Sequence, residues 1–76
     1  MTQSEKFWLC MSAAADHLHA RQFVMAQHRA ITAIRLAAFK CRCINENHPD
    51  MKHWSELLEW SQQVYERIYR LTQTRA

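Results

Sequence analysis

The chain contains no glycine and only one proline, Pro49, in 76 residues. Glycine supplies the backbone conformations that two-residue hairpin turns, phosphate-binding loops and dinucleotide fingerprints require. Those motifs are therefore excluded, and most enzyme signatures are excluded with them. The remaining composition, with 49% hydrophobic and 22% charged residues, is typical of a folded chain rather than a disordered one.

Apolar residues recur at the helical period along almost the whole chain, and this spacing predicts helices at about residues 4–20, 23–43 and 50–73. Thr2 followed by Glu5 predicts a capped start for the first helix, and Pro49 is expected in the first turn of the last one. Whether the first two helices are separate or form one continuous rod stays open. We expect an all-α fold, a small three-helix bundle made of a helical hairpin plus a third helix, in a single domain of residues 1–76.

Each predicted helix has one apolar stripe that is expected to face the core. The stripe of the middle helix is built largely from alanines, which allow close approach of a neighbouring helix. The three stripes include Phe7, Met11, Ala14 and Leu18; then Ala26, Ala30, Ala33 and Ala37; then Trp54, Leu57, Ser61, Val64 and Ile68.

The segment from Arg21 to Cys43 carries five Lys or Arg residues and no acidic residue, although the whole chain has a net charge of only +3. A seven-residue spacing keeps side chains near one line of a helix, so the segment is predicted to form a basic ridge. Further apolar side chains lie beside this ridge, off the predicted core face. The ridge consists of Arg21, His28, Arg35 and Arg42.

Two interpretations of the middle helix follow. It is either buried by both neighbours, or it presents apolar anchors bordered by cations to a partner. We favour a small cytoplasmic protein–protein interaction module from a bacterium or phage, a regulator or chaperone-like adaptor that binds an acidic protein partner or its own copy. A homo-oligomer is expected because so short a chain buries only a small core. The expected partner-binding residues are Met25, Ile31, Arg35, Leu36, Phe39, Arg42 and Trp60.

The alternative is a small DNA-binding transcriptional regulator that uses the basic middle helix, with arginines on phosphates and glutamines on base edges. A net charge of +3 is small for a dedicated nucleic-acid binder, so this function ranks second. Its expected contact residues are Arg21, Gln22, Gln27, His28, Arg29 and Arg35.

The spacing of the cysteines and histidines disfavours both a metal site and a catalytic site. Cys41 and Cys43, with His48 and His53, offer zinc ligands, but residues two apart on a helix point about 200° from each other. Cys10 and His17 are seven residues apart, beyond direct hydrogen-bond reach. We therefore expect no metal, no cofactor, no catalytic residue and no enzyme activity.

The three cysteines and the N-terminal sequence bear on the compartment. An odd number of cysteines disfavours a disulfide framework, and the N-terminus has no secretory signal pattern, so the reducing cytoplasm is expected. No apolar run approaches the roughly 20 residues that a membrane helix needs, so no membrane association is expected.

Parts of the chain also resemble known helical families. Ala14, then Phe23 and Ala26, then the segment Ala30 to Ile34, resemble the progression of tetratricopeptide-like hairpins. Tyr65 to Ile68 with Leu71 is similar to the last helix of microtubule-interacting and trafficking modules, which are three-helix domains. The alanine and aromatic pattern followed by Asn47 and Trp54 resembles small bacterial negative regulators of AraC-type activators. All three resemblances imply a protein-binding role.

Overall fold

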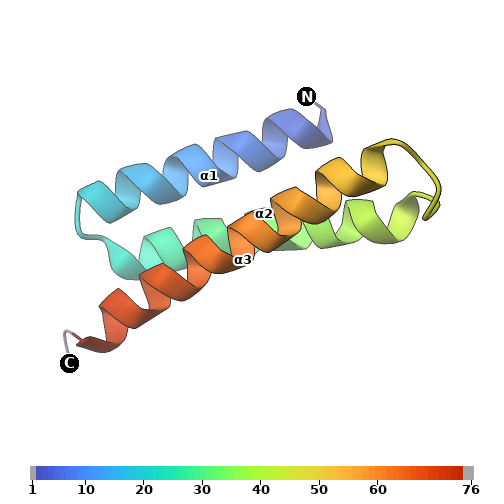
Figure 1. Cartoon of the computed structure of the whole chain (residues 1–76). Coiled ribbons are helices and arrows are strands. Elements are labelled where there is room, and N and C mark those ends of the chain that lie inside the picture. The colour runs from blue at the N-terminus through green and yellow to red at the C-terminus, as the bar shows by residue number, and fades with distance from the viewer. Residues whose placement is uncertain (1, 75–76) are drawn as a thin grey trace.

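The computed structural model, which describes residues 2–74, contains three helices: α1 (Gln3–His19), α2 (Phe23–Cys43) and α3 (Asp50–Thr74). The chain reverses direction twice, so α1 and α3 run the same way and α2 runs against them (Figure 1). The expected all-α three-helix bundle is confirmed, and each helix boundary lies within one residue of the predicted position. α1 and α2 are separate helices, which settles the question that the sequence left open.

The start of α1 forms as the sequence predicts. The Thr2 hydroxyl accepts a hydrogen bond from the Glu5 backbone N–H at 3.1 Å, which satisfies one of the amide groups left unpaired at a helix start.

The turn between α1 and α2 uses a left-handed residue. Arg21 has a φ of 60°, its N–H donates to the Leu18 carbonyl at 3.0 Å, and the Gln22 N–H donates to the His17 carbonyl at 2.8 Å. These two bonds form a Schellman motif, in which the left-handed position is usually glycine. The chain has no glycine, so Arg21 adopts this conformation at a cost of about 1–2 kcal/mol.

The start of α3 is capped by a histidine. The Nδ1 atom of His48 accepts a hydrogen bond from the Asp50 N–H at 3.0 Å. The backbone carbonyl oxygen of His48 accepts one from the Met51 N–H, also at 3.0 Å. Pro49 lies between these residues, at the position where its missing N–H leaves no hydrogen bond unmade. Pro49 therefore lies immediately before the first residue of α3, not within its first turn as expected.

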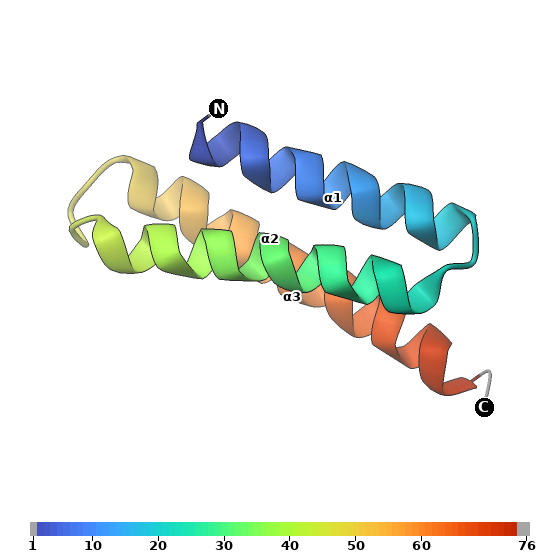
Figure 2. The same cartoon turned by 180° about the vertical axis from the view of Figure 1, so that it is seen from behind.

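α2 is the central helix and packs along both neighbours. Seen from behind, α2 lies in front of α3, and no helix of the described chain covers its outer side (Figure 2). α1 and α3 approach each other through aromatic rings in their N-terminal halves, where Phe7 lies 6.2 Å from Trp54 between ring centroids.

The core forms where the alanine stripe of α2 meets the other two helices. Ala26, Ala30, Ala33 and Ala37 are all fully buried. Ala33 and Ala37 pack in one cluster with Phe7, Met11, Trp54 and Leu57, and Ala26 and Ala30 pack in a second cluster with Ala14 and Ile68. Ser61 is also fully buried, and its hydroxyl donates to the Leu58 carbonyl at 2.9 Å, so it leaves no hydrogen bond unmade.

The bundle is elongated and flat, with principal extents of 44 × 24 × 13 Å. Its radius of gyration is 13.1 Å, whereas a compact chain of this length has about 11 Å. Its accessible surface is 5522 Å², compared with about 4,900 Å² for a compact monomer of this mass. Among residues 2–74, no helix combines the length and the apolar character needed to cross a bilayer.

We predict that Arg21→Gly stabilises the protein by about 1 kcal/mol, because glycine adopts positive φ without the steric cost that a side chain imposes. Thermal unfolding should show a rise in Tm of several degrees. Arg21→Val is the matched control and should lower Tm, because a β-branched residue is disfavoured still more at this φ. A lower Tm for Arg21→Gly would contradict the account of this turn.

We predict that Ala33→Leu destabilises the bundle by about 1–3 kcal/mol, because the larger side chain has no space between α2 and the rings of Phe7 and Trp54. The exposed neighbour Thr32→Leu should change stability by about 0.5 kcal/mol or less. Chemical denaturation of the two variants measures the difference, and equal effects would show that the alanine stripe is not closely packed.

Candidate functional site

The side of α2 that faces away from the alanine stripe carries large apolar residues. Val24, Met25 and Phe39 are 59%, 47% and 51% exposed. At 100° per residue they lie about 110–150° around the helix from the stripe. We call this side, with its exposed cations, the α2 outer face.

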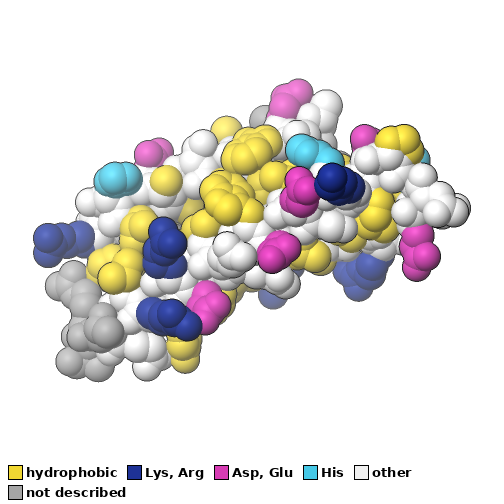
Figure 3. All heavy atoms as spheres, viewed as in Figure 1, with side chains coloured by type: hydrophobic (Ala, Val, Ile, Leu, Met, Phe, Trp, Pro, Cys, Tyr) yellow, Lys and Arg dark blue, Asp and Glu magenta, His cyan; other side chains and the backbone are white. Residues whose placement is uncertain are grey.

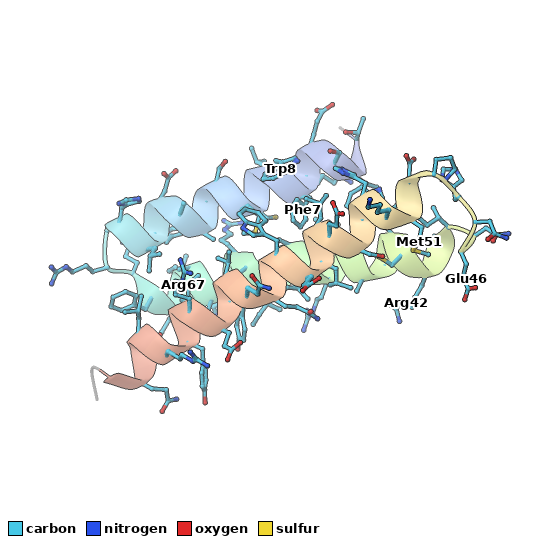
Figure 4. The ribbon with its side chains drawn as sticks, viewed as in Figure 1. Phe7, Trp8, Arg42, Glu46, Met51 and Arg67 are labelled. Atoms are coloured by element: carbon cyan, nitrogen blue, oxygen red, sulfur yellow. The ribbon has the colours of Figure 1, made fainter. Side chains whose placement is uncertain are left out.

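Cations flank the apolar residues of the α2 outer face. Arg35 precedes Phe39 by four residues and Arg42 follows it by three, so both lie beside it on the helix surface, and all three are exposed. Arg42 projects away from α1 near the end of the molecule where α2 turns toward α3 (Figure 4). The α2 outer face therefore combines an aromatic side chain with two guanidinium groups.

Six of the seven residues predicted to bind a partner lie on α2, but they differ in exposure. Met25, Arg35, Phe39 and Arg42 are exposed, whereas Ile31 and Leu36 are half-buried at the borders of the α2 outer face. The two half-buried residues could contribute only their outward edges to a contact.

The seventh residue, Trp60, is not on this face. Its ring centroid lies 5.5 Å from that of Trp8 and 6.5 Å from that of Phe7, both on α1. Trp60 and Trp8 are 41% and 45% exposed, and Leu9 beside Trp8 is 61% exposed. We call these three residues the aromatic seam. Hydrophobic side chains gather along the line between α1 and α3 (Figure 3), and Figure 4 shows Phe7 and Trp8 on α1 at this line.

Sequence reasoning placed Trp60 with the anchors of α2 and did not include Leu9. The sequence does show that Trp8 and Trp60 are each adjacent to a residue of a core stripe, on helices that run the same way. Two such residues can meet at the boundary between those helices, but the spacing alone does not fix which side of each helix faces the other.

The residues expected to contact nucleic acid are only partly free to do so. The Gln27 amide donates to the Thr72 hydroxyl at 3.0 Å, which ties α2 to α3, and the Gln22 amide oxygen lies 2.7 Å from Nδ1 of His17. The two glutamines expected to contact base edges are thus held within the molecule. Arg21, His28, Arg29 and Arg35 are exposed.

The candidate metal ligands do not form a cluster. In the part of the chain that the structure describes, no group of three or more His, Cys, Asp or Glu side chains could hold a metal ion. Cys43 is exposed at the end of α2, Cys41 is half-buried against the core, and His48 caps α3. Cys10, Cys41 and Cys43 are all free thiols.

Two open hollows lie on the outer surfaces of α1 and α3. The hollow on α3 is lined by Gln63, Glu66, Arg67, Arg70 and Leu71, and the guanidinium of Arg70 lies 2.6 Å from the Glu66 carboxylate. This exposed pair neutralises Arg70, so the hollow is not a concentrated anion site. The hollow on α1 is lined by Ser4, Glu5, Trp8, Leu9 and Ser12, and it adjoins the aromatic seam.

Comparisons with protein-family models, with curated proteins and with solved structures found no match to this chain.

We predict that Phe39→Glu changes the free energy of unfolding by about 1 kcal/mol or less, because half of the Phe39 side chain already faces solvent. Phe7→Ala should cost about 3–5 kcal/mol, because Phe7 is fully buried. Urea denaturation of both variants tests the assignment. A loss for Phe39→Glu as large as that for Phe7→Ala would place Phe39 in the core instead of on a binding face.

Proposed function

We propose that the chain is a small protein–protein interaction module that binds an acidic protein partner through the α2 outer face. The observation that carries this proposal is the exposure of Phe39 between Arg35 and Arg42, on the side of α2 that no neighbouring helix covers. Aromatic and arginine side chains in such surroundings are the residue types that contribute most to binding energy at protein interfaces.

The two kinds of side chain on the α2 outer face have different roles in this proposal. Phe39, with Met25 beside the ridge, supplies apolar area that leaves water on binding. Arg35 and Arg42 attract and orient an acidic partner, which mainly sets the association rate and the choice of partner. The helices themselves remain a rigid frame, because the anchors are not part of the alanine core.

The positive charge of α2 indicates that the surface of the partner is acidic. Between Phe23 and Cys43 there are four Lys or Arg residues and no carboxylate, so an approaching acidic surface meets no like charge on this helix. A DNA-binding function would use the same cations, but Gln22 and Gln27 are engaged within the molecule. A protein partner is therefore favoured over nucleic acid.

A reducing compartment is part of the proposal. The cysteines are three free thiols, and Cys43 is exposed. Free thiols stay reduced in the cytoplasm, so they support a cytoplasmic location in this proposal. In this proposal the chain acts as a regulator or adaptor by occupying a surface of its partner.

The test is to capture the partner from the native host with the tagged chain and then to measure its affinity by calorimetry. Phe39→Glu should weaken binding at least tenfold, because truncating a central anchor costs about 2 kcal/mol or more. The double variant Arg35→Glu/Arg42→Glu should slow association and change its salt dependence.

The matched control is Gln62→Glu, which adds the same charge at an exposed position of α3. This variant should bind the partner like the wild-type chain. Equal affinities for Phe39→Glu and Gln62→Glu would contradict the proposal. Binding of duplex DNA that weakens steeply with added salt would instead favour the nucleic-acid function.

A further inference from the structure

The bundle exposes more surface than its mass requires, by about 600 Å² relative to a compact monomer. A stable protein–protein interface removes about 800 Å² from each partner. The excess area is therefore comparable with the area that one partner buries in such an interface. Six of the eight large apolar side chains that are exposed among the described residues lie on the α2 outer face or in the aromatic seam; the other two, Tyr69 and Leu71, lie near the C-terminal end of α3.

The helices that form the two surfaces differ in charge. α2 has four cations and no anion, whereas α1 and α3 together carry six carboxylates and four cations. Glu5 lines the same hollow as Trp8 and Leu9, and Glu56 precedes Trp60 by four residues, so it lies beside it on α3. Two carboxylates thus lie beside the aromatic seam, and two guanidinium groups lie beside Phe39 on the α2 outer face.

Pairing a surface with its own copy would oppose like charges. Two α2 outer faces in contact would bring Arg35 and Arg42 of one copy toward those of the other, and two aromatic seams would oppose Glu5 and Glu56. Pairing the α2 outer face of one copy with the aromatic seam of another removes both conflicts and covers both apolar surfaces.

We propose that a second copy of this chain docks its aromatic seam on the α2 outer face, in a head-to-tail contact. This inference rests on the proposed function, because it uses the same α2 face and assigns the acidic surface that this face binds to a second copy of the chain. Phe39 of one copy then meets Trp8 and Trp60 of the next, with Arg35 and Arg42 near Glu5 and Glu56.

A head-to-tail contact has a consequence that a symmetric dimer lacks. Each copy in a pair still has one free α2 outer face or one free aromatic seam, so further copies can add. The wild-type chain should therefore form assemblies of more than two copies, either closed rings or open chains, and the average molar mass in solution should rise with protein concentration.

The experiment blocks one surface at a time and measures molar mass by light scattering from about 10 μM to about 1 mM. Phe39→Glu blocks the α2 outer face, and Leu9→Lys/Glu56→Lys blocks the aromatic seam with cations. Each variant alone should stay at the mass of one copy, 9.1 kDa. An equimolar mixture should form a dimer that grows no further, because each variant supplies the surface that the other lacks.

Circular dichroism establishes that both variants are folded, and Gln62→Lys is the control, which should assemble like the wild type. A wild-type chain that stays at one copy overturns the proposal, as does a mixture that forms no dimer. A wild-type dimer that Leu9→Lys/Glu56→Lys leaves intact also overturns it, because that dimer is symmetric through α2. If assembly fails while Phe39→Glu still loses a captured partner, the proposed function stands without self-docking.

Discussion

The contact between the alanine stripe of α2 and the two flanking helices determines the rest of this structure. Four fully buried alanines let α1 and α3 lie close to α2, and the volume of the core is supplied by Phe7, Trp54 and Ile68 from the flanking helices. The inward side of α2 is lined by alanines, whereas Val24, Met25 and Phe39 lie on its other side. A helix with this distribution stabilises the bundle and still presents Phe39 and Met25 to solvent.

The fold could be predicted from the sequence to a large extent, because the helical period is strong and one of the two turns is marked by its residue types. Pro49 and the polar residues around it define one turn. The other turn was harder to place, since Arg21 carries no turn signal and its left-handed conformation is imposed by the two helices that it joins. Burial of the alanines followed from their spacing, because four of them share one face at the helical period.

The surface could be predicted only in part. The exposure of Phe39 and Met25 follows from their positions off the alanine stripe, and the cations beside them are visible in the sequence. The position of Trp60 did not follow, because it depends on which side of α3 turns toward α1. The contacts of Gln27 with Thr72 and of Gln22 with His17 were also not predictable, since they join segments whose relative rotation the sequence does not specify.

The conformation of Arg21 has a consequence for the order of folding events. A residue that disfavours positive φ does not promote a reversal, so the α1–α2 hairpin is closed by contacts between its helices and not from its turn. We expect the left-handed backbone to be adopted late, after the barrier to folding has been crossed. Relieving the strain at this position would then lower the unfolding rate and leave the folding rate almost unchanged.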